Sequence, residues 1–180
     1  MHPRIEEVLG YLDTCRNELS EAVNLVPESM RETQPGPDRW SVAQVLDHLT
    51  MIDRRVGIGL KKWIAEARAA NLGTETETSS VVNTIPVSSI KDRSRRVNAP
   101  EAIRPSTEVS AAAAWVALES AREDLRSAFI AGDGLALTEV IQPHPVLGPI
   151  NIYQWVLFVG SHEARHADQV REIASELRLS

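Results

Sequence analysis

Two histidines near the C-terminal end of the chain have the spacing of paired metal ligands. His162 and His166 are four residues apart, and residues at this spacing lie on one face of a helix, with side chains ~6 Å apart. Both occupy positions on an apolar stripe, so they are expected to point inward. Each buried imidazole needs a partner for a nitrogen lone pair, and one metal ion would satisfy both rings. The alternative is a pair of hydrogen-bonded core histidines.

His48 is the candidate third ligand. It lies on the same apolar stripe as Val45 and Ile52 in a second predicted helix, so it too should face the interior. Three protein ligands leave coordination positions open, as in catalytic metal sites. Imidazoles accept zinc, nickel or iron alike, so the sequence predicts one divalent transition metal without identifying it. His2 and His144, near the terminus and in a proline-flanked loop, are not expected to be ligands.

Residues 162–166 also match the metalloprotease pattern H-E-x-x-H, in which the glutamate acts as general base. The extended form of that pattern would need glycine at Gln169 and histidine at Glu172. A protease also needs an edge strand to hold an extended peptide, and no such strand is expected upstream. An HExxH-type metalloprotease is therefore the least favoured function.

Glu163 is the candidate catalytic residue. It lies ~60° from His166 around the helix, at the border of the core face, where a carboxylate can act as a general base or orient a ligand. The alternative is an exposed glutamate paired with a neighbouring arginine. Gln44 and Gln169, a turn away from the histidines, are candidates to orient the imidazoles, although Gln44 also fits a capping box with Ser41.

The histidines need helices to hold them, and the apolar pattern predicts four. Apolar residues recur at spacings of three and four over four segments: residues 3–26, 41–69, 106 or 107 to 132 or 134, and 151–177. Pro27 ends the first helix, and Gly148 with Pro149 introduces the last. The sequence therefore predicts an all-α four-helix bundle, one domain over residues 1–180, with a long crossover between the second and third helices.

The crossover, residues 71–106, loses the helical pattern and is rich in Thr, Ser, Pro and charge. Connections of this length are functional or poorly ordered, and we expect partial order with a short strand-like piece at Val81, Val82 and Ile85. The basic run over residues 91–96 is short, and we interpret it as a solvated loop rather than a phosphate site.

Composition and charge exclude several partners. The net charge of -6 and the pI near 5.4 argue against a nucleic-acid surface. No run of about 18 apolar residues is present, so no membrane span is expected, and the N-terminus lacks the pattern of a signal peptide. The single cysteine, Cys15, cannot form an internal disulfide. The expected location is the cytoplasm.

Two motifs resemble the DinB-like superfamily of metal-binding helical proteins. The first, over residues 40–49, is similar to the family's W-S-x-x-x-x-x-x-H-L segment, and the second, over residues 162–170, to its H-x-x-x-H-x-x-Q-[IV] helix. A weaker likeness covers residues 97–105, which are similar to a proline-containing family loop before the third helix. Together these motifs span nearly the whole chain in the family's order.

The resemblance implies a site and a class of chemistry. It places the family's metal triad on His48, His162 and His166. It implies a metal-dependent transferase or isomerase using a low-molecular-weight thiol, or a hydrolase, in which the metal lowers the pKa of a bound thiol or water. It also implies a homodimer, and the Ala-rich segment 111–114 provides a smooth face for close packing.

Three hypotheses remain open from the sequence. The first is a metal-dependent enzyme acting on a small molecule, as a thiol S-transferase or a hydrolase. The second is a metal- or ligand-binding bundle without catalysis. The third is a dimeric bundle whose histidines are core residues only. Metal content and chelator-sensitive turnover distinguish the three.

Overall fold

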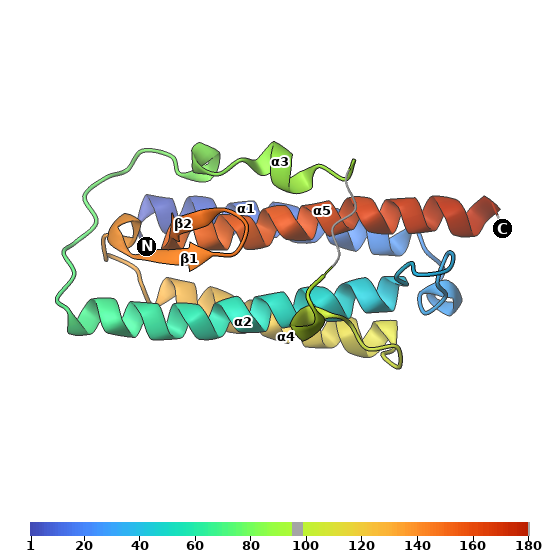
Figure 1. Cartoon of the computed structure of the whole chain (residues 1–180). Coiled ribbons are helices and arrows are strands. Elements are labelled where there is room, and N and C mark those ends of the chain that lie inside the picture. Colours follow the sequence, from blue (N-terminus) through green and yellow to red (C-terminus); the bar gives the residue numbers. More distant parts are fainter. Residues whose placement is uncertain (95–98, 180) are drawn as a thin grey trace.

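The computed structural model describes residues 1–94 and 99–179, with the side chains described as far as residue 177 (Figure 1). The helices and strands within these residues are α1 (Pro3–Asn24), α2 (Val42–Ala69), α3 (Val87–Lys91), α4 (Ala111–Ile130), β1 (Ile141–His144), β2 (Gly148–Asn151) and α5 (Ile152–Leu179). Four single-turn 3-10 helices complete the described part: η1 (Glu28–Met30), η2 (Val82–Thr84), η3 (Glu101–Ile103) and η4 (Leu137–Glu139). The predicted mainly helical class is confirmed, and a small two-stranded sheet is added to it.

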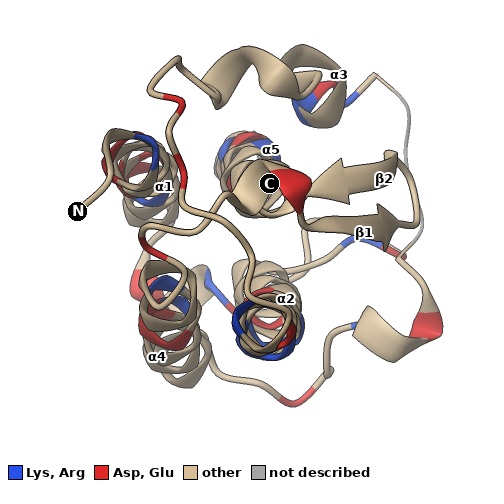
Figure 2. Ribbon diagram, turned by 90° about the vertical axis from the view of Figure 1, so that its left-hand side faces the viewer, with Lys and Arg blue, Asp and Glu red and all other residues tan. Residues whose placement is uncertain are grey.

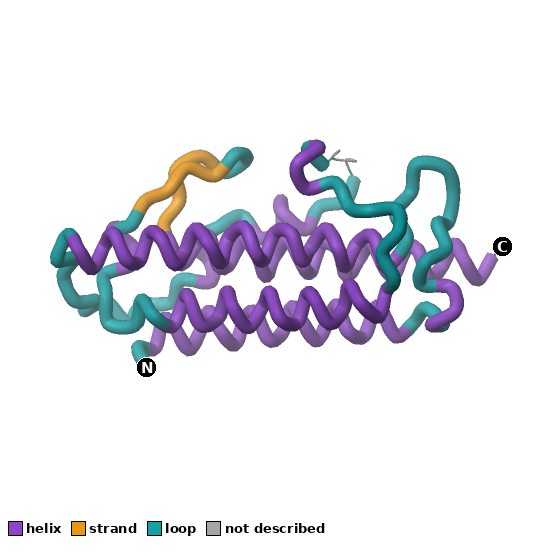
Figure 3. The backbone as a smooth tube through the Cα atoms, turned by 90° about the horizontal axis from the view of Figure 1, so that it is seen from below, coloured by secondary structure: helices purple, strands orange, loops and turns teal. Residues whose placement is uncertain are grey.

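The four long helices run side by side as two closely packed pairs. Helix α1 packs mainly against α5, and α2 packs mainly against α4. Figure 2, which looks along the helices, shows the four at the corners of a square with α5 at the corner next to α2. The strands and part of the crossover lie together on one side of the long helices (Figure 3). No helix among the described residues is long and apolar enough to cross a membrane.

Apolar side chains fill the interior in two separate clusters. The first contains the N-terminal half of α1, the C-terminal half of α2 and the start of α5, with Phe129 and Tyr153 among its largest buried side chains. The second contains the other ends of these helices, including Leu19 and Leu46. Burying these stripes is the main source of stability for helices of this kind.

The helix starts follow from capping residues. Ser41 and Gln44 form the predicted capping box at α2, because each side chain accepts a hydrogen bond from the other's backbone N–H. The predicted start of α4 at residue 106 or 107 was wrong. Ser110 is the N-cap, accepting from the Ala113 N–H at 3.2 Å, whereas the Ser106 hydroxyl accepts from the Glu108 N–H outside the helix.

The crossover contains short helical turns instead of the predicted strand-like piece. Val81 and Ile85 are buried against the first apolar cluster, and η2 lies between them. These apolar side chains therefore pack on the helices. Part of the basic run 91–96 and part of the family-like loop 97–105 fall on residues 95–98, outside the described residues.

The hairpin of β1 and β2 precedes α5 and was not predicted. Its strands pair antiparallel, with Pro143 opposite Pro149, and its turn is held by Nδ1 of His144, which accepts from the N–H groups of Val146 and Leu147. Gly148 adopts φ +75°, a conformation that favours glycine. The expectation that no strand lies upstream of the histidine pair was therefore wrong.

Candidate metal centre

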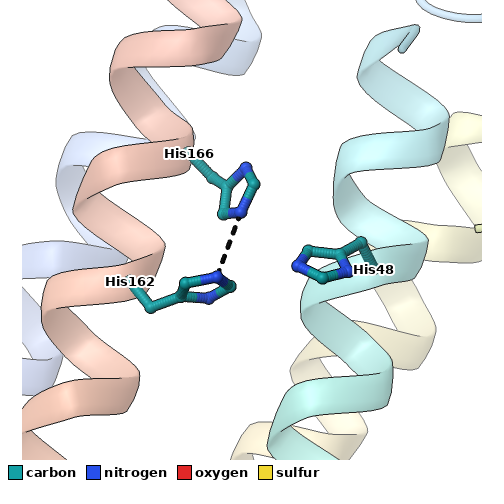
Figure 4. Close-up of side chains that lie close together, drawn as sticks. All are labelled: His48, His162 and His166. Atoms are coloured by element: carbon teal, nitrogen blue, oxygen red, sulfur yellow. Dashed lines mark hydrogen bonds between the residues drawn. The ribbon is translucent and has the colours of Figure 1, made fainter. Parts of the chain in front are cut away.

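The structure brings His48, His162 and His166 together between α2 and α5 (Figure 4). One nitrogen of each ring lies within 4.8 Å of the others. The Nε2 atoms of His162 and His166 are 3.2 Å apart. Two nitrogen ligands of one tetrahedral zinc ion, each ~2.0–2.1 Å from the metal, are separated by about 3.3 Å. The spacing of this pair therefore fits a shared metal ion.

Hydrogen bonds orient two of the three rings. Nδ1 of His48 donates to the carbonyl oxygen of Ile103 in η3 at 2.8 Å, and Nδ1 of His166 donates to Oε1 of Gln169 at 2.8 Å. Because both acceptors require a proton on Nδ1, each Nε2 carries a lone pair, and that of His166 accepts a hydrogen bond from Nε2 of His162 (Figure 4). A cation held among the rings would bind both lone pairs and replace this hydrogen bond.

His162 is held differently. Its Nδ1 is buried and, within the described part of the chain, has no hydrogen-bond partner. Burial, followed by the neighbouring His48, lowers the pKa of His162 to about 3. Burial also lowers the pKa of His48 and, together with His162, the pKa of His166. All three rings are therefore neutral near pH 7, the state in which imidazole binds a metal.

Aromatic rings flank the three histidines on both sides. Trp40 stacks over His166 with ring centroids 6.2 Å apart and lies 5.0 Å from the His48 ring. Phe158 stacks on His162 at 5.5 Å. These rings limit the access of water to the nitrogens. Neither Phe158 nor the Ile103 carbonyl was identified from the sequence. The carbonyl could not be, because a backbone carbonyl carries no residue-type signal.

The two other histidines lie outside this group. The ring of His144 packs at 4.2 Å from Phe158 and 4.6 Å from Trp155. The side chain of His2 accepts from the Arg4 N–H at the start of α1. Each therefore has a local structural role.

The two glutamines predicted as candidates to orient the imidazoles have different partners. Gln169 contacts His166 as described above. Gln44 serves the capping box and accepts from Nε2 of Gln34 at 3.1 Å. Of these two side chains, only that of Gln169 has a hydrogen bond to a histidine among the described residues.

Glu163 points away from the histidines into the interior. Its side chain is 1% exposed, and its two oxygens pair with Nε of Arg16 at 2.5 Å and Nη2 of Arg122 at 2.6 Å. The interpretation of Glu163 as an exposed glutamate was wrong, because the side chain is buried. It does pair with arginines, and these come from α1 and α4. A catalytic role for Glu163 stays a prediction, and both of its oxygens are engaged in ion pairs.

Comparisons with known proteins identify relatives of the chain. The family model of the DinB superfamily matches residues 11–170. The uncharacterized protein YuaE of Bacillus subtilis (strain 168) is 29% identical over 159 residues, which cover 88% of this chain and 91% of that protein. No solved structure matches the chain.

Proposed function

Because the chain belongs to the DinB superfamily, we propose that it binds one divalent transition metal through His48, His162 and His166 and uses it on a small molecule. In this proposal α1, α2, α4 and α5 form the four-helix bundle of the family. The observation that carries the proposal is the convergence of three neutral imidazoles, two of which have Nδ1 engaged by an oxygen and so carry a lone pair on Nε2.

The chemistry proposed is activation of a thiol or water. A bound metal would supply a Lewis acid that lowers the pKa of such a ligand and makes it a better nucleophile. The protein's part is to hold the imidazoles in one tautomer, through Ile103 and Gln169, and to limit water around them with Trp40 and Phe158. A thiol S-transferase or a hydrolase uses this arrangement.

Metal binding without catalysis is the second candidate function, favoured by the burial of the rings. His48 is 3% exposed and His166 is 7% exposed, so a substrate would reach them only if the covering segments moved. Proteolysis has less support. Both oxygens of Glu163 are held by arginines, and prolines 143 and 149 remove donors that a hairpin would need to bind a peptide.

Metal analysis tests the proposal. The wild type should hold about one equivalent of transition metal after purification without a tag, and the His48→Ala, His162→Ala double variant almost none. A His2→Ala, His144→Ala double variant is the matched control, because it also loses two histidines but keeps the three grouped rings. If the wild type takes up no zinc or nickel even after incubation, the histidines are structural and the proposal fails.

Turnover separates the enzyme from the binding protein. A screen of low-molecular-weight thiols with electrophiles, and of hydrolysable esters and amides, should reveal activity that a chelator abolishes and the His162→Ala variant lacks. A wild type that holds metal but remains silent throughout this screen would favour the binding function.

A further inference from the structure

Four charged side chains, one from each long helix, meet inside the molecule, and three of them are buried. We call Arg16, Asp53, Arg122 and Glu163 the charge cluster. Nε of Arg122 donates to Asp53 at 2.8 Å and its Nη2 to Glu163 at 2.6 Å, while Nε of Arg16 donates to the other oxygen of Glu163. The side chains of Asp53, Arg122 and Glu163 are at most 7% exposed. Two positive and two negative charges make the cluster neutral.

The charge cluster divides the core at the same level of all four helices. In each helix the charged residue lies between members of the two apolar clusters. The flanking pairs are Leu12 and Leu19 in α1, Leu49 and Val56 in α2, Leu118 and Leu125 in α4, and Val159 and Ala167 in α5. The cluster is therefore a single polar layer between two apolar ones.

A buried ion pair is a weak source of stability, because removing the charges from water offsets most of their attraction. A polar layer has a different effect on alternative packings. If one helix slid or turned, its charge would face apolar side chains and lose its partners, so the layer penalises every register but one. The layer therefore specifies the relative placement of the helices.

This placement bears on the histidines because α2 and α5 belong to different helix pairs. His48 comes from α2, packed mainly on α4, and the other two rings come from α5, packed mainly on α1. The same two helices supply both acids of the charge cluster. Asp53 lies five residues after His48, and Glu163 lies between the two histidines of α5. Arg122 binds both acids and so connects the two histidine-bearing helices.

We infer that the charge cluster is a positioning device for the histidine group, in which the Arg122 guanidinium sets α2 and α5 so that three imidazole nitrogens converge. The inference rests on the proposed metal site. Metal ligands tolerate deviations of only ~0.2 Å, so a small rotation of α5 would weaken binding. Arg122 is a positioning residue and does not touch the metal.

The fork geometry of the guanidinium should matter as well as its charge. The shortest hydrogen bonds of Arg122 are from Nε to Asp53 and from Nη2 to Glu163, and Nη2 also reaches Asp53 at 3.5 Å. A lysine ammonium is a point charge without that planar fork. Arg122→Lys keeps the charge of the cluster and loses the bridge. Arg122→Met removes the charge and the bridge with a side chain of similar length.

Zinc affinity and unfolding, measured on the same variants, test the inference. Arg122→Met, Arg122→Lys and Glu163→Gln should each bind zinc at least ten-fold more weakly in a chelator competition and change the visible spectrum of bound cobalt. Glu75→Gln is the matched control. Glu75 is a buried acid near the other end of α2, paired with Arg4 at 3.1 Å and Tyr153 at 3.2 Å. The Glu75→Gln variant should keep its zinc affinity within two-fold of the wild type, although its loss of stability in urea should be comparable to that of the Arg122 variants.

A metal-free measurement tests the helix placement itself. Nitroxides at Arg54→Cys and Ser175→Cys, both exposed, report the distance between α2 and α5 by electron spin resonance when the Cys15 thiol is replaced by alanine. Without metal, Arg122→Met should broaden or shift this distance distribution, and Glu75→Gln should not.

The outcomes separate this inference from the proposed function. The positioning role alone is overturned if the wild type binds zinc and the Arg122 variants bind it within two-fold of the wild type and keep the wild-type distance distribution. An equal fall in affinity in Glu75→Gln also overturns it, because the effect is then general destabilisation. Wild type without zinc binding overturns the proposed function and the positioning of a metal site together.

Discussion

At the scale of single residues, the three imidazoles differ in what holds their second nitrogen. A backbone carbonyl holds His48, a side-chain amide holds His166, and the corresponding nitrogen of His162 has no partner in the described regions. Only the contact to His166 can be removed by changing a side chain. Gln169 is therefore the position at which the contribution of such a contact to metal affinity can be measured.

Gln169→Ala should weaken metal affinity by ~10–100-fold, the usual effect of losing a partner that orients a ligating histidine. Without the amide oxygen, His166 is free to turn and to change tautomer. Zinc competition with a chromogenic chelator measures the effect. Gln44→Ala is the control, since Gln44 caps α2 instead, and it should lower stability by ~1 kcal/mol with affinity unchanged. Equal losses of affinity in both variants would contradict the assignment of Gln169.

At the scale of elements, the closely packed pair of α1 and α5 requires a small residue where side chains of one helix lie against the backbone of the other. A Cβ at Gly160 in α5 would lie 2.9 Å from Cε1 of Tyr11 in α1. The hydroxyl of the same tyrosine forms a hydrogen bond with Oγ of Ser161 at 2.9 Å. The contact between α1 and α5, which places the histidine pair, therefore depends on the absence of a side chain at residue 160.

Gly160→Ala should destabilise the protein by roughly 1–3 kcal/mol, because the added methyl group displaces the Tyr11 ring from a packed site. Gly10→Ala is the matched change in α1, where a Cβ meets nothing within 4 Å. It should stabilise by roughly 0.5–1 kcal/mol, the helix preference of alanine over glycine. Urea unfolding of both variants measures whether each change raises or lowers the free energy of unfolding. Stabilisation by Gly160→Ala would show that Tyr11 yields without cost.

At the scale of the whole molecule, burial keeps protons on acidic groups of α1. Burial raises the pKa of the Cys15 thiol from 9.0 to about 11 and that of Tyr11 from 10.0 to about 12. Between these values the folded protein retains protons that the unfolded chain releases. Raising the pH through that interval therefore favours the unfolded chain.

The free energy of unfolding should change little near pH 8 and then fall as the pH rises toward 11, by on the order of 2 kcal/mol for the buried thiol. Urea unfolding at pH 8, 9.5 and 10.5 measures the slope. Cys15→Ala removes the titrating thiol and should make the decline shallower, leaving the part due to Tyr11 and Tyr153, whose pKa values burial also raises. A slope that does not differ between wild type and Cys15→Ala would exclude the thiol as its cause.

Local patterns in the sequence determined the helices and which residues face inward. Apolar spacing predicted the extents of α2 and α5 closely, and the Ser41 and Gln44 pair predicted the start of α2, because helix periodicity and caps act within a few residues. The same spacing placed His48, His162 and His166 on inner faces, and the family resemblance joined them into one group. The charged residues at core positions, Arg16, Asp53 and Arg122, were not identified from the sequence.

The tertiary structure alone decided which inward residues meet. Glu163 contacts Arg16 of α1 and Arg122 of α4. His48 contacts the carbonyl of Ile103, 55 residues away in the sequence. The hairpin likewise formed where two short proline-containing strands could pair before α5. Such contacts depend on the rotation and register of packed helices, which no local spacing specifies, because every helix offers several inward positions and packing selects among them.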